Sequence, residues 1–355
     1  MYYSKIGQAG AGFTNQIFAL ITSIINAYKN GNKVVVVDDF LNDIGKKTYT
    51  PISKIFDIEK TNVFLKENYD IIIIDKNNIQ FDLIWIKYGS NESNYIDLTD
   101  VIKKQYFHKK KLFIDKNIVF NDIKGDPCQG TLKKIIIKYK INDYYIEEIY
   151  NENLNSNIVI NFAGPYLFEL GWINSFNDNM FDKILKNISY HNDFITKSKL
   201  ILNKIDKQKK INIIHLRLEQ DGIEHWSKMN NITSEQYKIY LEEKYINIIK
   251  KYTQQSDQNI ILSNSLSNGV INFLKQNNYN YKFIDKCYHD REKDAIVDLL
   301  SSKYCNNFFI GNFNINKCNG STFSYYIWKL LGDNITKIYI DLDKIYDTEV
   351  VVSKS

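Results

Sequence analysis

The first forty residues combine short apolar runs with one helical pattern. Residues 2–6 can pair in a sheet, 7–12 form a glycine-rich turn, and 16–29 repeat apolar side chains at helical spacing. Gly31 is placed to end this helix, and 33–37 is a continuous apolar strand followed by two aspartates. A strand, a helix and a second strand in this order are typical of a βαβ unit, which predicts a parallel sheet.

Strand and helix patterns continue along the chain. Further strands are expected at 71–75 and 158–162, with irregular polar segments between them, and 183–205 is polar and helical. A second α/β set follows, with strands at 211–216, 259–263, 282–284 and 308–310 and helices at 234–252, 266–277, 291–302 and 321–331. This alternation predicts two Rossmann-like α/β domains, over 1–205 and 206–355, facing each other across a cleft.

Composition narrows the class of protein. A chain of 355 residues with 44% hydrophobic residues can fill about two domain cores. The net charge of +5 comes from basic residues scattered among nearly as many acids, so no surface for nucleic acid stands out. No segment has the roughly 18 apolar residues of a membrane span, and the start does not read as a signal peptide. We therefore expect no nucleic-acid partner, no membrane span and a cytoplasmic location.

The cysteines and histidines do not indicate a metal centre. The four cysteines form no CxxC pair and have no metal-ligand spacing with the five histidines. Cysteines this sparse in a chain of this length are typical of a reducing compartment. The expectation is a protein without a metal cofactor.

Arginine is rare in this chain, which makes its positions informative. Of the 46 basic residues, only Arg217 and Arg291 are arginines. A guanidinium can bind a phosphate or carboxylate through two parallel hydrogen bonds, which an ammonium does poorly. Arg217 follows the apolar strand that begins at 211, and open α/β sheets bind ligands beyond the carboxyl ends of their strands. Arg217 is thus a candidate ligand-binding residue, with a surface ion pair as the alternative, whereas Arg291 is interpreted as the start of a helix.

Three other segments have polar groups suited to a ligand. Residues 10–16, GAGFTNQ, form a glycine turn that opens a helix, so backbone N–H groups can approach an anion or a hydroxyl. Asp298 lies in an apolar helical pattern and could accept the N1–H and N2–H groups of a guanine. Ser321 and Thr322 open a helix after the strand 308–310 and a turn, where hydroxyl and N–H groups would hold a diphosphate. Structural alternatives are a surface acid for Asp298 and a helix cap for Ser321.

Together, these segments resemble the GDP-fucose-dependent fucosyltransferase superfamily, in its protein O-fucosyltransferase branch. Residues 12–16, GFTNQ, are similar to its G-[FR]-x-N-Q element, and 215–221, HLRLEQD, to its H-L-R-x-x-x-D element. Residues 297–299, 309–312 and 321–323 are similar to its C-terminal D…FIGN…S-[ST]-F element. The elements follow one another in the family's order and span nearly all of the chain.

The resemblance implies a GT-B fold and an inverting, metal-independent transfer of fucose from GDP-fucose to a hydroxyl of a glycan or protein. The domain 1–205 would face the acceptor, and the domain 206–355 would bind the nucleotide sugar. Arg217 would bind the β-phosphate and stabilise the leaving GDP, and Asn15 would reach the transferred sugar or the acceptor hydroxyl. The donor-binding residues implied are Gly10, Gly12, Phe13, His215, Asp221, Asp298, Ser321, Thr322 and Phe323. A fixed guanidinium can neutralise a departing diphosphate where no metal is present.

This chain departs from the family pattern at two places. Some members have a carboxylate inside the first glycine turn as general base, whereas this chain has Ala11 there. We predict that Glu219 deprotonates the acceptor, with Asp39 as the alternative, and no base is needed if the transition state is strongly dissociative. The seven residues 313–319 are an insertion that could displace the phosphate-binding loop.

Other functions are compatible with the same residues. The donor could be another nucleotide sugar, or the protein could bind a nucleotide or sugar without catalysis. A metal-dependent glycosyltransferase of the GT-A class would need a DxD motif, and Asp341-Leu342-Asp343 has these letters. That motif follows the last predicted helix, so we interpret it as a surface turn. The retained Arg217 favours a catalytic site over a decayed one.

Overall fold

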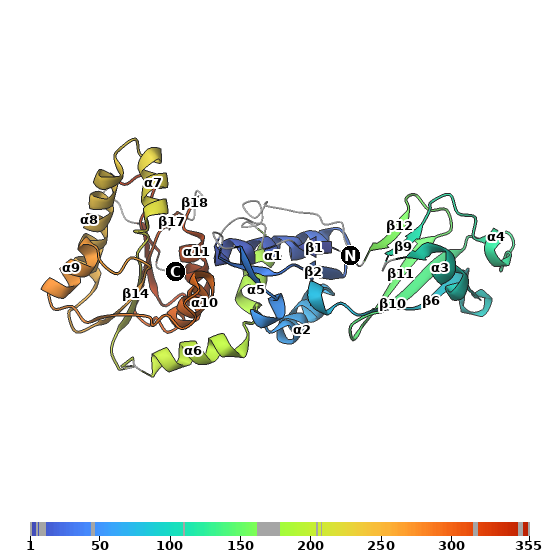
Figure 1. The fold of residues 1–355 in the computed structure, drawn as a ribbon, viewed down its shortest axis with the longest axis horizontal. Coiled ribbons are helices and arrows are strands. Elements are labelled where there is room, and N and C mark those ends of the chain that lie inside the picture. The colour runs from blue at the N-terminus through green and yellow to red at the C-terminus, as the bar shows by residue number, and fades with distance from the viewer. Residues whose placement is uncertain are drawn as a thin grey trace.

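Two α/β units and one β-rich unit make up the protein. The computed structural model describes residues 2–4, 6, 12–43, 47–108, 111–161, 178–203, 205–206, 208–314, 319–346 and 351–353. The N-terminal α/β unit lies in the middle of the molecule, between the C-terminal α/β unit and the β-rich unit (Figure 1). The predicted α/β class is confirmed, because each α/β unit is built on a parallel sheet.

The N-terminal unit contains a parallel sheet in the order β1-β2-β5. Its strands are β1 (Tyr2–Ser4), β2 (Val34–Val37) and β5 (Ile72–Asp75), beside a hairpin of β3 (Phe40–Asp43) and β4 (Thr48–Thr50). Its helices are α1 (Phe13–Lys29), α2 (Ile58–Tyr69) and α5 (Asn179–Asn187), and the next helix, α6 (Asn192–Leu202), packs against α10 (Arg291–Ser302) of the C-terminal unit. The four valines of β2 are all buried, as in the middle strand of a covered parallel sheet. The predicted βαβ unit is therefore present, and the helix expected at 183–205 is two helices.

Residues 81–161 form the β-rich unit, which the sequence pattern did not predict. It contains the antiparallel sheets β11-β10-β6-β7 and β12-β9-β8. Its strands are β6 (Phe81–Gly89), β7 (Ile96–Asp97), β8 (Phe107–His108), β9 (Lys111–Ile114), β10 (Lys134–Ile141), β11 (Tyr144–Asn151) and β12 (Ile158–Asn161), and its helices are α3 (Thr99–Tyr106) and α4 (Asn121–Lys124). The expectation of irregular polar segments was wrong, because lysines, tyrosines and glutamates here occupy the outer face of half-buried strands. The strand expected at 158–162 exists as β12, but it pairs with β9 and not with the parallel sheet.

The C-terminal unit has a six-stranded sheet in the order β15-β14-β13-β16-β19-β20. Its strands are β13 (Ile211–His215), β14 (Gln258–Leu262), β15 (Tyr281–Phe283), β16 (Phe308–Gly311), β19 (Thr336–Tyr339) and the antiparallel edge strand β20 (Val351–Ser353), with a short pair β17 (Phe313–Asn314) and β18 (Asn319–Gly320). Its helices are α7 (Gln220–Met229), α8 (Ser234–Tyr252), α9 (Gly269–Gln276), α10 (Arg291–Ser302) and α11 (Thr322–Leu330). Starting from the central pair β13 and β16, the chain adds β14 and then β15 on one side, and β19 and then β20 on the other. The carboxyl ends of β13 and β16 are therefore the switch point where such sheets bind ligands.

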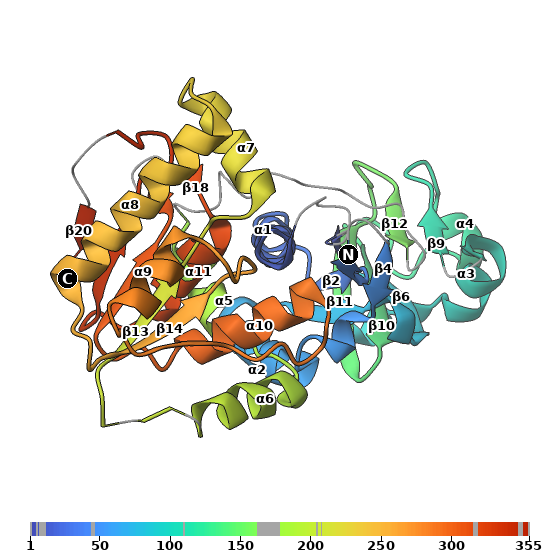
Figure 2. The same ribbon diagram turned by 60° about the vertical axis from the view of Figure 1, so that its left-hand side comes forward.

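One hydrophobic core joins the two α/β units. Helix α1 packs against α10 and α11 of the C-terminal unit, and Figure 2 shows this arrangement along the axis of α1. Phe13 stacks on Tyr326 with ring centroids 6.3 Å apart, and Phe18 meets Tyr325 edge-on at 5.8 Å. The predicted domain boundary at 205/206 falls between α6 and β13 and stays a prediction. This packing brings residues from both units into one site.

Candidate active site

A cavity of about 550 Å³ lies between the two α/β units. It is lined by all the site residues expected from the sequence that the structure describes: Gly12, Phe13, Asn15, His215, Arg217, Glu219, Asp221, Asp298, Ser321, Thr322 and Phe323. The expected site residue Gly10, and Ala11 beside it, lie outside the described residues. Segments from the beginning, middle and end of the chain thus meet at one place.

Four helices begin at this cavity. Phe13, Asp221, Arg291 and Thr322 lie in the first turns of α1, α7, α10 and α11, and all four residues line it. The first N–H groups of a helix have no partner within the helix, and the helix dipole is positive at this end. The N-termini of α7 and α11 therefore favour an anionic ligand, whereas those of α1 and α10 already meet the carboxylates of Glu292 and Asp290.

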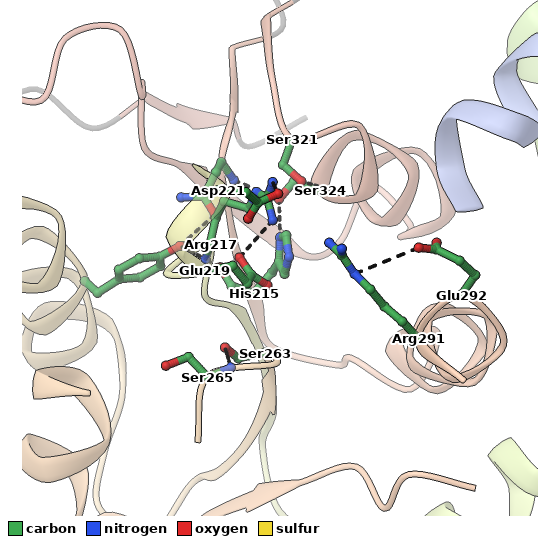
Figure 3. A network of polar contacts seen from close by, with 12 residues as sticks. His215, Arg217, Glu219, Asp221, Ser263, Ser265, Arg291, Glu292, Ser321 and Ser324 are labelled. Atoms are coloured by element: carbon green, nitrogen blue, oxygen red, sulfur yellow. Dashed lines mark hydrogen bonds and ion pairs between the residues drawn. The ribbon is translucent and has the colours of Figure 1, made fainter. Parts of the chain in front are cut away.

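Two carboxylates hold the Arg217 guanidinium in place. Nη1 donates to Glu219 Oε2 at 2.9 Å and Nη2 to Asp221 Oδ2 at 3.2 Å (Figure 3). The side chain lies over Gly222, where an added Cβ would be 3.2 Å from Arg217 Nε. Burial opposes the charge, but Glu219 and Asp221 outweigh it and raise the pKa of Arg217 above its usual value. The structure thus provides a permanent cation of fixed orientation.

These contacts bear on the choice of a general base. Glu219 Oε2 is already occupied as the acceptor of the Arg217 guanidinium. The contact with Arg217 therefore favours an orienting role for Glu219 over its predicted role as base. Asp39, the alternative, is not among the residues that line the cavity and forms an ion pair with Lys76 at 2.9 Å.

His215 is a neutral ring beside this cation. Its Nδ1 lies 2.6 Å from Ser324 Oγ, and that hydroxyl accepts the N–H of Asn312 at 2.9 Å. The hydroxyl proton is thus free to bind Nδ1, which assigns the ring proton to Nε2. Burial, and then the nearby charge of Arg217, lower the pKa of His215 to about 3. His215 can therefore donate a hydrogen bond in the cavity without adding a charge.

The buried hydroxyl of Tyr245 ties the two central strand ends together. It accepts from the Arg217 N–H at 3.1 Å and lies 2.7 Å from the His215 carbonyl oxygen and 2.6 Å from Asn312 Oδ1. The segment after β13 and the segment after β16 thus share one partner from α8. The sequence pattern does not single out Tyr245, because it is one of 26 tyrosines and lies in an ordinary helical pattern.

The two ends of the insertion at 313–319 lie side by side before α11. Strands β17 and β18 pair with each other, and the Ser321 N–H donates to the Asn312 carbonyl oxygen at 2.6 Å. Asn312 and Ser321, on either side of the insertion, are therefore adjacent, and the displacement of the phosphate-binding loop stays a prediction. Gly320 has a φ of +118°, and an added Cβ there would be 2.4 Å from the Asn312 oxygen, so this turn requires glycine.

Contacts between the units fix the beginning of α1. Thr322 Oγ1 donates to Asn15 Oδ1 at 2.8 Å. The Phe13 N–H donates to the buried carboxylate of Glu292 on α10. The N-cap of α1, Gly12, has no side-chain cap, and the first turn has no acidic residue, so Glu292 provides the cap from the other unit.

Asp298 is a buried carboxylate beside the cavity. Its Oδ2 accepts from Lys286 at 3.1 Å, while its buried Oδ1 has no hydrogen-bond partner in the part of the chain that is described. Burial raises the pKa of Asp298 to about 6, against the lowering effect of Lys286. A buried acceptor without a donor is costly, so the site is suited to a ligand that brings N–H groups.

Further lining residues were missed by the sequence analysis: Gly222, His225, Trp226, Ser263, Asn264, Arg291 and Glu292. Arg291 is the first residue of α10, as predicted, but its side chain also extends toward the cluster around His215 (Figure 3). The scarcity of arginine that singled out Arg217 was the available signal for Arg291 as well. Glu292 had no such signal, because its position depends on the packing of α10 against α1.

Neither a membrane-spanning helix nor a metal-ligating cluster occurs in the described ranges. These ranges contain no helix with both the length and the apolar character to cross a bilayer. In the same ranges, no group of three or more His, Cys, Asp or Glu side chains is arranged to hold a metal ion. Asp341 and Asp343 lie in a turn, where the Asp343 N–H donates to Asp341 Oδ1 at 3.1 Å, and neither lines the cavity.

Comparisons with known proteins give distant structural similarities. No protein-family model and no curated protein sequence matches the chain. The structure is similar to the fucosyltransferase NodZ from Bradyrhizobium, with 11% identity and a TM-score of 0.46 over 100% of this chain and 96% of that chain. For the NodZ alpha-1,6-fucosyltransferase co-crystallized with GDP, the identity is 12% and the TM-score is 0.49, over 100% of this chain and 96% of that chain. For POFUT1 in complex with GDP-fucose, the identity is 10% and the TM-score is 0.46, over 90% of this chain and 91% of that chain. Similarities this distant do not by themselves assign a function.

Proposed function

We propose that this protein transfers fucose, with inversion, from GDP-fucose to a hydroxyl of a glycan or protein acceptor. The observation that carries the proposal is the convergence on one cavity of the three sequence elements that resemble fucosyltransferases. The cavity combines a fixed guanidinium, several helix N-termini and a buried carboxylate with an unpaired oxygen. These are the groups needed to bind a diphosphate and a guanine, and the volume is in the usual range for ligand sites.

The donor is proposed to lie along the C-terminal unit. Arg217 and the first turn of α11, with Ser321 and Thr322, would bind the diphosphate. Asp298 Oδ1 would accept N–H groups of the guanine, and the Nε2–H of neutral His215 would donate to the nucleotide. The transferred sugar would then point toward Asn15 and the start of α1. This placement assigns donor binding to 206–355 and acceptor binding to 1–205, as in a GT-B enzyme.

The chemical step is proposed to rely on electrostatic stabilisation. As the bond between fucose C1 and the β-phosphate oxygen breaks, negative charge grows on the departing GDP. Arg217 is already oriented by Glu219 and Asp221, so little reorganisation is needed when this charge appears. The reaction is proposed to need no metal ion. The sparse cysteines support a cytoplasmic location for it.

A thermal-shift panel tests this function. Purified protein would be heated with GDP, GDP-fucose, GDP-mannose or UDP-sugars, each with and without EDTA. We expect GDP and GDP-fucose to stabilise the protein by about 2.7 kcal/mol at a hundredfold excess over Kd, unchanged by EDTA. Stabilisation by UDP-sugars that requires Mn²⁺ would refute the proposal. GDP binding without GDP release from GDP-fucose would favour a non-catalytic binding protein.

Tyr245→Phe tests how the site is held in place. The change removes the shared partner of the Arg217 N–H, the His215 carbonyl and Asn312, so the loop that carries the guanidinium should loosen. We expect a loss of about 1–3 kcal/mol in stability and about tenfold weaker GDP binding. Denaturant unfolding and calorimetric titration would measure both. Tyr237→Phe on the same helix is the control, because its hydroxyl donates to Leu342 O at 3.3 Å, away from the cavity. An equal loss of GDP affinity in both variants would contradict the role of Tyr245.

A further inference from the structure

We infer that Glu292 is the general base that removes the proton from the acceptor hydroxyl. This inference rests on the proposed function and identifies a catalytic residue for it. Glu292 is buried, lines the cavity, and meets the backbone at the start of α1, although it belongs to α10 of the other unit. Its carboxylate therefore lies on the N-terminal side of the cavity, where the proposed acceptor would enter.

The other carboxylates that line the cavity are already engaged with cations. Glu219 and Asp221 both accept hydrogen bonds from Arg217, at 2.9 and 3.2 Å. Asp298 accepts from Lys286 at 3.1 Å. For Glu292, the ion pair that the structure shows is a long one, with Arg291 Nε 3.9 Å from Oε1. Among the four lining carboxylates, Glu292 is thus the least neutralised.

The geometry around Glu292 leaves one of its oxygens for a substrate. Oε2 accepts the Phe13 N–H, which fixes the carboxylate against the start of α1. Gly12 makes this close approach possible, since an added Cβ would be 3.1 Å from Oε2 and 3.5 Å from Oε1. Among the described residues, the ion pair of Oε1 is the long contact with Arg291, and Oε1 lies beside Gly12, directly before α1. A hydroxyl held near Asn15 would meet this oxygen.

The charges near Glu292 support its basicity. Burial raises its pKa, which the Phe13 N–H and then Arg291 partly offset, while Asp290 and Asp43 raise it further. Asp290 precedes α10 and Asp43 lies on β3, so acidic groups face Glu292 from both units. A carboxylate with a raised pKa accepts a proton more readily near neutral pH than an ordinary glutamate does.

The proposed step is balanced in atoms and charge. The acceptor O–H bond breaks and its proton passes to Glu292 Oε1. The acceptor oxygen forms a bond to fucose C1 on the face opposite the phosphate. The bond between C1 and the β-phosphate oxygen breaks, and its electron pair leaves with GDP, beside Arg217. Products are the fucosylated acceptor, GDP and protonated Glu292, which later returns its proton to solvent.

Glu292→Gln in the full chain tests the assignment, with water as the acceptor and GDP release from GDP-fucose as the readout. The Gln amide oxygen can still accept the Phe13 N–H, so the cap of α1 should persist. We expect GDP release to fall about 100-fold, with the Kd for GDP-fucose within twofold of the wild-type value. Glu224→Gln is the matched control, since this exposed residue of α7 contacts Gln220 and does not line the cavity. It should change neither quantity.

The pH dependence separates a base from a structural cap. Wild-type GDP release should rise with pH as Glu292 loses its proton, and this limb should be absent in Glu292→Gln. Release in the variant within threefold of wild type, at equal GDP-fucose binding, would overturn the assignment. A wild-type protein that binds GDP-fucose but releases no GDP to water would favour a non-catalytic binding protein, and so would refute the proposed transfer and not the assignment alone. Failure of the wild type to bind GDP-fucose would instead refute the proposed function itself.

Discussion

Replacing Arg217 by lysine is expected to reduce turnover of GDP-fucose by about a thousandfold, the usual size for loss of a key donor to a developing anion. Lysine keeps the charge but cannot donate to Glu219, Asp221 and a phosphate from one rigid plane. The loss should appear mainly in kcat, because the guanidinium is needed most when charge builds up on the leaving GDP. Steady-state GDP release, together with GDP titration, would measure it.

Arg291→Lys is the matched control for this prediction. Arg291 also lines the cavity, but its side chain is 55% exposed and its contact with Glu292 is long, at 3.9 Å. Its replacement should cost tenfold or less in turnover, as expected for a solvated charge. If Arg217→Lys retained turnover within tenfold of the wild type, the guanidinium would not be the stabiliser of the leaving group.

Asp298→Asn is expected to weaken GDP-fucose binding by about a thousandfold and yet to stabilise the free protein. Two charge-assisted hydrogen bonds to guanine would be lost, at about 1.5–3 kcal/mol each. The folded-state pKa of about 6, against the usual 3.8, means that ionised Asp298 destabilises the fold by up to about 3 kcal/mol. The neutral amide avoids this cost, so the melting temperature should rise by a few degrees at pH 7.5.

The raised pKa of Asp298 also determines how the stabilising effect of Asp298→Asn and the GDP-fucose affinity change with pH. Below about pH 4 the carboxyl is protonated in both folded and unfolded chains, so Asp298→Asn should give little stabilisation there. The stabilising effect should grow between about pH 4 and 6 and then remain constant. GDP-fucose affinity of the wild type should be constant above about pH 6 and fall toward tenfold per pH unit below it. GDP-fucose suits this titration because its esterified diphosphate lacks the phosphate ionisation near pH 6.

Asp294→Asn, one turn earlier on α10, is the control. Asp294 Oδ1 accepts the N–H groups of Cys287 and Tyr288 at 2.8 and 2.9 Å, so its carboxylate is well paired. Its replacement should lower the melting temperature and affect the donor much less. A melting temperature that falls in Asp298→Asn would show that the carboxylate contributes to the fold and is not held ready for a ligand.

The periodicity of the chain predicted four strands and four helices of the C-terminal unit, but not the strands β19 and β20. Its buried strands are continuous apolar runs and its helices have clear apolar spacing, so the expected helices at 234–252 and 291–302 are those of the structure. The β-rich unit was missed because each of its strands buries one face only. In a chain so rich in lysine, asparagine and tyrosine, such strands look like polar loops. Helix α7 was missed as well, although it begins within the segment that carries Arg217.

The sequence by itself determined which local segments could bind a ligand, because a glycine turn, an arginine beyond a strand and a serine at a helix start are properties of neighbouring residues. Only the tertiary structure decided how these groups act together. Side-chain directions decide that Glu219 pairs with Arg217 and that one oxygen of Asp298 is unpaired. The contact of Glu292 with the start of α1 joins residues that are 279 positions apart in the sequence. Burial and charge pairing set the chemistry of each carboxylate, and both are fixed only when the two units pack together.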